Sequence, residues 1–172
     1  YIAHSNGKLL LNIPIKHTQK GLRKKTNEVH VENSFPWQIQ HWKSLESAYR
    51  TSPYFEYYED ELRPLFFKRV RSLFDFNLEG FDLICGLLEI SKSYDFTEEY
   101  YKNPSQLDLR SLVSPKLDLA IKLDPYFQVL NTENDFIANL SILDLLFNEG
   151  PNTVSYLESQ KIDFSQINSI QK

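Results

Sequence analysis

The sequence contains no methionine, one cysteine and five glycines among its 172 residues. With Cys85 alone the chain can form no internal disulfide, which predicts a cytoplasmic protein in a reducing compartment. Cys85 lies in the apolar stretch FDLICGLLEI and is expected to be buried and inert. No apolar run is long enough to span a bilayer, so we expect no membrane span. Residues 1–15 lack the pattern of a signal peptide.

Apolar and aromatic residues are plentiful, at 41% and 14% of the chain. This content excludes a largely disordered protein and predicts one folded domain over residues 1–172 with a sizeable core. The chain begins at Tyr1 and opens on what resembles the middle of a sheet. We therefore expect the domain to be incomplete at its N-terminus.

Charge is unevenly distributed. The formal net charge is −4, yet residues 1–25 carry six Lys or Arg side chains and no acid. An acidic balance overall disfavours a nucleic-acid binder, so no nucleic acid is expected as a partner. The basic segment, which includes Lys24 and Lys25, could form a local anion-binding site; the alternative is a solvated loop without a ligand.

Periodicity predicts an α+β fold, with a short N-terminal antiparallel strand pair followed by a mostly helical body. The pair is expected between residues 8–14 and 29–32, joined by an exposed loop over 16–26, and a further short strand is expected at 126–130. Helices are expected at 36–50 with Ser34 as its cap, at 54–76 with an interruption near Pro64, at 78–90, at 140–149 ending at Gly150, and at 151–159.

Asp144 stands inside an apolar helix, where a bare carboxylate is costly to bury. Ser141, Asp144 and Asn148 share one helical stripe, which suits a site that holds a base or grips a sugar hydroxyl. The alternative is a structural carboxylate bonded by backbone or arginine donors. His41, beside Trp42, is a candidate general base, or a half-buried packing residue.

Motifs for metals and common cofactors are missing. The four histidines show no metal-ligand spacing, and the sequence has no Walker A, GxGxxG or GxSxG motif, so we predict no metal site and can name no cofactor. Residues 49–62 are rich in aromatic rings, which suit a sugar or nucleotide site or, alternatively, a core cluster.

Two long blocks, HWKSLESAYRTSPYFEYYEDELRPLF and LSILDLLFNEGP, resemble the WbqC-like protein family of bacteria, in the version common in Bacteroidetes. NGKLLLNIPI and LFDFN extend the likeness over most of the chain. Family members carry a further N-terminal segment, which agrees with an incomplete start. The resemblance implies a role in surface-polysaccharide and O-antigen biosynthesis, and the matching positions are His41, Trp42, Tyr49, Ser52, Pro53, Tyr54, Ser141, Asp144, Asn148 and Gly150.

Two functions follow from this resemblance. The first is a transferase that acylates or aminoacylates a nucleotide-linked amino sugar, with His41 and Asp144 as its acid–base pair. The diphosphate of the nucleotide-linked sugar, or of another phosphorylated small molecule, would contact Lys24 and Lys25. The other expected ligand-binding residues are Trp42, Tyr49, Arg50, Tyr54, Ser141 and Asn148. The alternative is a non-catalytic binding or assembly protein that uses its aromatic cluster as a contact surface. A pocket joining His41 to Asp144 favours the enzyme.

Overall fold

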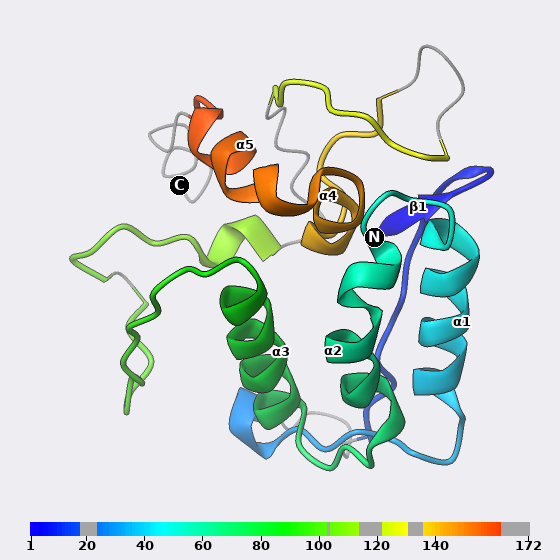
Figure 1. Ribbon diagram of the computed structural model, residues 1–172. Coiled ribbons are helices and arrows are strands. Elements are labelled where there is room, and N and C mark those ends of the chain that lie inside the picture. The colour runs from blue at the N-terminus through cyan, green and yellow to red at the C-terminus, as the bar shows by residue number, and fades with distance from the viewer. Residues whose placement is uncertain (18–23, 103, 114–121, 131–135, 163–172) are drawn as a thin grey trace.

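A computed structural model of the protein describes residues 1–17, 24–102, 104–113, 122–130 and 136–162. The chain opens with an antiparallel pair, β1 (Ile2–His4) and β2 (Gly7–Leu9), in which Ile2 lies opposite Leu9. Helices make up most of the remaining regular structure (Figure 1). The predicted α+β class, a short strand pair followed by a mostly helical body, is confirmed.

The strand pair lies earlier in the chain than expected. Residues 8–14 and 29–32 meet only around an isolated bridge between Ile15 and Val31, where the Glu32 N–H donates to the Pro14 carbonyl at 2.9 Å. Proline has no N–H with which to continue a ladder. Residues 29–31 also bond to the segment before α3, since the Val31 N–H donates to the Arg71 carbonyl. Within the expected 16–26 loop, the side chains at 16, 17 and 24–26 are exposed, and 18–23 lie outside the described residues.

Five α-helices and three short 3-10 helices occur in the described part of the chain. The α-helices are α1 (Trp37–Tyr49), α2 (Phe55–Phe67), α3 (Leu73–Leu87), α4 (Ile142–Glu149) and α5 (Thr153–Ser159). The 3-10 helices are η1 (Thr26–Glu28), η2 (Arg110–Val113) and η3 (Gly150–Asn152). The two predicted helices on either side of the Gly150–Pro151 junction are thus confirmed.

Three local predictions are wrong. Ser34 does not cap α1, because Pro36 occupies the cap position and no side chain bonds there. Helix α2 continues through Pro64 and ends at Phe67; Asp60 and Pro64 are both exposed, so the carbonyl that loses its helical partner faces water. Residues 126–130 form no strand, and the Val129 N–H donates instead to the Asn148 side chain at 3.0 Å.

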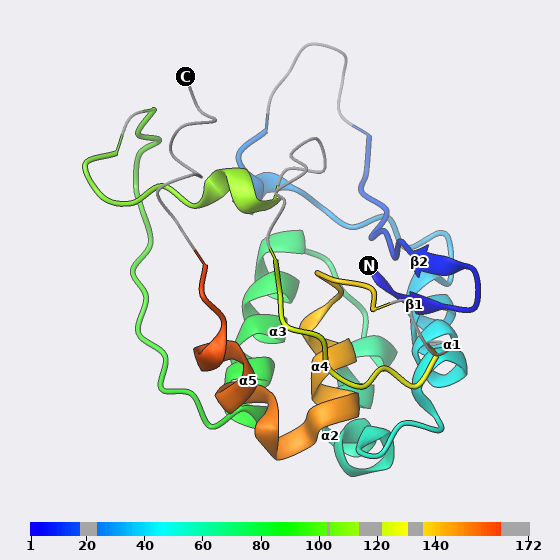
Figure 2. The ribbon, with the colours of Figure 1, turned by 90° about the horizontal axis from the view of Figure 1, so that it is seen from above.

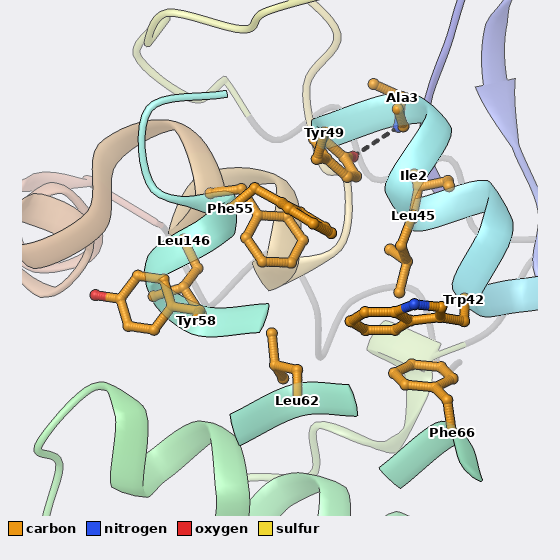
Figure 3. Close-up of a cluster of buried hydrophobic side chains, with 12 residues drawn as sticks. Ile2, Ala3, Trp42, Leu45, Tyr49, Phe55, Tyr58, Leu62, Phe66 and Leu146 are labelled. Atoms are coloured by element: carbon orange, nitrogen blue, oxygen red, sulfur yellow. Dashed lines mark hydrogen bonds between the residues drawn. The ribbon is translucent and has the colours of Figure 1, made fainter. Parts of the chain in front are cut away.

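The main core lies where β1, α1, α2 and α4 meet (Figure 3). Trp42 of α1 packs against Phe66 of α2, with ring centroids 5.5 Å apart, and Phe55 packs against Phe147 of α4 at 5.0 Å. Cys85 is buried, as expected. Seen from above, the strand pair and α1 lie on one side of the molecule and α3 on the other (Figure 2).

Gly150 ends α4 in a conformation that favours glycine, with φ of 53°. A Cβ placed there would meet ring carbons of Tyr54 at 2.6 Å. Tyr54 cannot easily retreat, because its N–H donates to the Phe147 carbonyl at 3.0 Å. This contact seats the end of α4 on the start of α2, so a side chain at Gly150 would disturb both helices.

Replacing Gly150 by alanine should therefore lower the free energy of unfolding by about 2–4 kcal/mol, through the left-handed backbone and the clash together. Gly86→Ala is the matched control. Gly86 lies in α3, and a Cβ placed there would meet no atom of the described residues within 4 Å beyond its own stretch of helix, so alanine should stabilise the fold by about 0.5–1 kcal/mol. Urea unfolding of both variants measures the two changes in the free energy of unfolding. Equal changes would contradict a specific requirement for glycine at position 150.

Candidate functional site

The Asp144 carboxylate is fully buried and hydrogen-bonded through both oxygens. Its Oδ1 accepts a bond from the Tyr49 hydroxyl at 2.8 Å. Its Oδ2 accepts bonds from the Tyr126 hydroxyl at 2.5 Å and from Nε2 of Gln128 at 3.0 Å. Three donors surrounding one carboxylate explain how an acid is accommodated within an apolar helix.

Burial keeps the two phenols in their protonated, donating form. It raises the pKa of Tyr49 far above 10, and the negative charge of Asp144 raises it further. The pKa of Tyr126 is raised in the same direction, first by burial and then by its hydrogen bond to Asp144. The Tyr49 hydroxyl also accepts a bond from the Ala3 N–H at 2.9 Å (Figure 3). The carboxylate is therefore linked to β1 through a single side chain.

The remaining polar residues of the α4 stripe bond to nearby backbone. Ser141 caps α4, its hydroxyl accepting from the Leu143 N–H at 3.3 Å. Asn148 accepts the Val129 N–H and donates to the Asp144 carbonyl at 2.7 Å. The stripe thus faces residues 126–129, and its described bonds are those of a structural element. Tyr126 and Gln128 were missed by the sequence reasoning, because they lie in a segment that was expected to form a strand, and no sequence spacing connects that segment with residue 144.

His41 lies on α1 with partners of its own. Its Nε2 is 3.1 Å from the Asn12 carbonyl oxygen, and its ring meets Trp37 edge-on at 5.1 Å. Because a carbonyl only accepts, Nε2 carries the proton of this bond. Partial burial lowers the pKa of His41 from its usual 6.5, and the bond to Asn12 opposes that shift.

The structure does not bring His41 and Asp144 into contact. Tyr49, which holds Asp144, lies about 12 Å further along α1 than His41, given the rise of an α-helix. Within the described residues, no hydrogen bond, ion pair or ring contact joins the two. The expected cleft shared by the pair is therefore not supported, and a catalytic role for either residue stays a prediction.

The other expected ligand-binding residues are dispersed. Trp42 and Tyr49 are core residues, 2% and 0% exposed, while Tyr54 packs beneath Gly150. Arg50 is exposed and forms ion pairs with Glu46 and Glu59, on α1 and α2.

The basic residues lie far from the α4 stripe. Lys24 and Lys25 are exposed and precede η1, which lies beside the start of α3, at the opposite end of the molecule from α4 (Figure 1). The structure therefore does not support a single ligand site that unites these lysines with Asp144, and a ligand-binding role for Lys24 and Lys25 stays a prediction.

A hollow of about 260 Å³ lies between the turn of the strand pair and the outer face of α1. Polar side chains on its wall are His4, Ser5, Lys43, Ser44 and Ser47. They place an ammonium, an imidazole and three hydroxyls around one space, beside the apolar Leu130. Donors of this kind bind phosphate oxygens and sugar hydroxyls. Within the described ranges, no group of acidic, histidine or cysteine side chains could hold a metal ion.

Comparison with known proteins identifies one family. The model of the WbqC-like protein family matches residues 1–123. No curated protein and no solved structure gives a significant match. Among the described residues, no helix has the length and apolar character needed to cross a bilayer.

The raised pKa values of Tyr49 and Tyr126 predict a loss of stability in alkali. Both phenols hold their protons more tightly in the folded state, so this stabilisation is complete below pH 10 and falls as pH rises above it. Each phenol should contribute a slope of about 1.4 kcal/mol per pH unit to the free energy of unfolding.

Tyr126→Phe should lower the free energy of unfolding at neutral pH by about 1–3 kcal/mol. Above pH 10 it should also make the fall of this free energy with pH less steep, by the contribution of one titrating phenol. Tyr57→Phe, at a ring that is 73% exposed, is the control. Urea unfolding between about pH 9 and pH 11 measures both effects. Identical slopes for the two variants would show that the half-buried Tyr126 phenol does not contribute to the loss of stability in alkali.

Proposed function

The chain belongs to the WbqC-like protein family, and on that premise we propose that it binds a nucleotide-linked sugar in bacterial surface-polysaccharide biosynthesis, without transforming it. The observation that carries this proposal is the burial of Asp144, whose carboxylate is 0% exposed and bonded through both oxygens. A carboxylate held in this way has no contact with an incoming substrate. Its hydrogen bonds stabilise the fold, so we infer that Asp144 takes no part in acid–base chemistry and that the protein binds its ligand without transforming it.

The hollow beside α1 is the proposed ligand site. Lys43 forms no ion pair with any described residue, so its ammonium is available to a phosphate. Ser5 and Ser47 are exposed on the same wall and supply hydroxyls for a sugar. Lys24 and Lys25 remain a predicted anion site on a separate part of the surface.

Titration calorimetry with a panel of nucleotide-linked sugars tests the proposal. Lys43→Gln should weaken binding about tenfold, and more strongly at low salt, where the attraction between charges is least screened. Lys102→Gln removes an exposed lysine outside the hollow and should leave affinity unchanged. The bound sugar should be recovered intact. Equal affinities for the two variants would exclude this hollow, and recovery of a modified sugar would exclude a purely binding role.

Acyl transfer is the second candidate, and His41 is the observation in its favour. With Nε2 donating to the Asn12 carbonyl and the pKa lowered by burial, the neutral ring presents Nδ1 as a base near pH 7.

If the protein transfers an acyl group, His41→Asn should reduce kcat by at least about a hundredfold. His30→Asn, at an exposed histidine outside α1, should leave kcat unchanged. Turnover measured with an acyl donor and a nucleotide-linked amino sugar decides the matter. Full activity in the His41 variant would exclude His41 as the base.

A further inference from the structure

A second hollow, of about 330 Å³, lies where α2, the end of α3 and η3 meet. Its volume is within the range of small-molecule sites. Two carboxylates, Glu61 of α2 and Glu89 just after α3, stand on its wall together with the rings of Tyr57 and Tyr58. Neither carboxylate forms an ion pair within the part of the chain that the structure describes.

Glu89 occupies a position that is unfavourable for glutamate in two ways. Its φ is 55°, in the left-handed region. It ends α3 in a Schellman motif, with the Glu89 N–H donating to the Gly86 carbonyl at 3.1 Å and the Ile90 N–H to the Cys85 carbonyl at 2.9 Å, where glycine is the usual residue. In addition, its negative charge lies at the negative end of the helix dipole. A bound cation would offset the unfavourable interaction between the Glu89 charge and the negative end of the helix dipole.

The aromatic rings add a further attraction for positive charge. Tyr57 and Tyr58 meet edge to face, with centroids 4.8 Å apart, and Tyr57 is 73% exposed. Burial raises the pKa of Tyr58, and the charges of Glu89 and Glu61 contribute in the same direction, which agrees with both carboxylates lying near its phenol. Ring faces and carboxylates are the groups that bind ammonium and guanidinium ions.

We propose that this hollow binds a small organic cation, through an ammonium or guanidinium group held between Glu61 and Glu89 and against the Tyr57 and Tyr58 rings. The carbonyl end of α3 adds its partial negative charge to the same space. The apolar wall, which includes Leu87 and Val154, suits the uncharged body of such a ligand. This site is separate from the hollow beside α1 and does not depend on the function proposed for it.

Three probes test the site by NMR titration of the full chain. Butylguanidine carries a guanidinium as its only charge, glucosamine carries an ammonium on a sugar, and N-acetylglucosamine is a neutral sugar of similar shape. At least one of the cationic probes should shift resonances of residues 57, 58 and 86–89, and the neutral probe should not. Preference for butylguanidine or for glucosamine shows whether the site favours a guanidinium or an ammonium group. Equal binding of the neutral sugar, or no shift with any probe, would overturn the proposal.

Variants separate binding from folding. Glu61→Gln and Glu89→Gln should each weaken the cationic probe about tenfold. Glu89→Gly should raise the melting temperature, because glycine accepts the left-handed backbone, and should still weaken the probe. Glu56→Gln, on the same helix but outside the hollow, is the control and should bind as the wild type does. Unchanged affinity in the Glu61 and Glu89 variants would overturn the proposal even if the probes bind.

Discussion

The hydrogen bonds to Asp144 hold together parts of the chain that are distant in sequence. Tyr49 brings in α1, Tyr126 and Gln128 bring in the segment before α4, and Tyr49 also receives the Ala3 N–H of β1. A buried carboxylate demands such partners, because an unbonded charge in an apolar setting is strongly unfavourable. The aromatic packing of α1, α2 and α4 is thus arranged around one polar requirement.

This arrangement separates a structural interior from the surface hollows that are proposed as ligand sites. Asp144, which was expected to be catalytic, and Asn148, which was expected to bind ligand, bond instead to other parts of the chain. The two hollows are lined by different elements and differ in charge. One presents Lys43 and hydroxyls, and the other presents Glu61 and Glu89 beside tyrosine rings. Each is suited to a ligand of the opposite charge.

Some features encoded locally could be predicted from the sequence, although the cap of α1 and the path of α2 through Pro64 were not. Features that depend on distant partners could not be predicted. The helices on either side of Gly150 follow from an apolar run and a glycine–proline junction. The predicted pairing of residues 8–14 with residues 29–32 was wrong. Residues 29–31 bond to residues 71–73 as well as to the segment around Pro14. The sequence left open whether Asp144 is a site residue or a structural carboxylate bonded by backbone or arginine donors. Its tyrosine donors were not predicted, since no spacing connects residue 144 with Tyr49 or Tyr126. The separation of His41 from Asp144 likewise depends on tertiary packing.

The Tyr49 hydroxyl, which accepts from one neighbour and donates to another, also restricts how this sequence can change over evolution. A change at Tyr49 or Tyr126 alone leaves the Asp144 carboxylate short of a donor, and a change at Asp144 alone leaves the phenols of the buried Tyr49 and the half-buried Tyr126 without this acceptor. Conversion to an apolar core therefore requires several substitutions together, each harmful by itself. The three positions form an epistatic unit, in which the effect of any substitution depends on the residues at the other two.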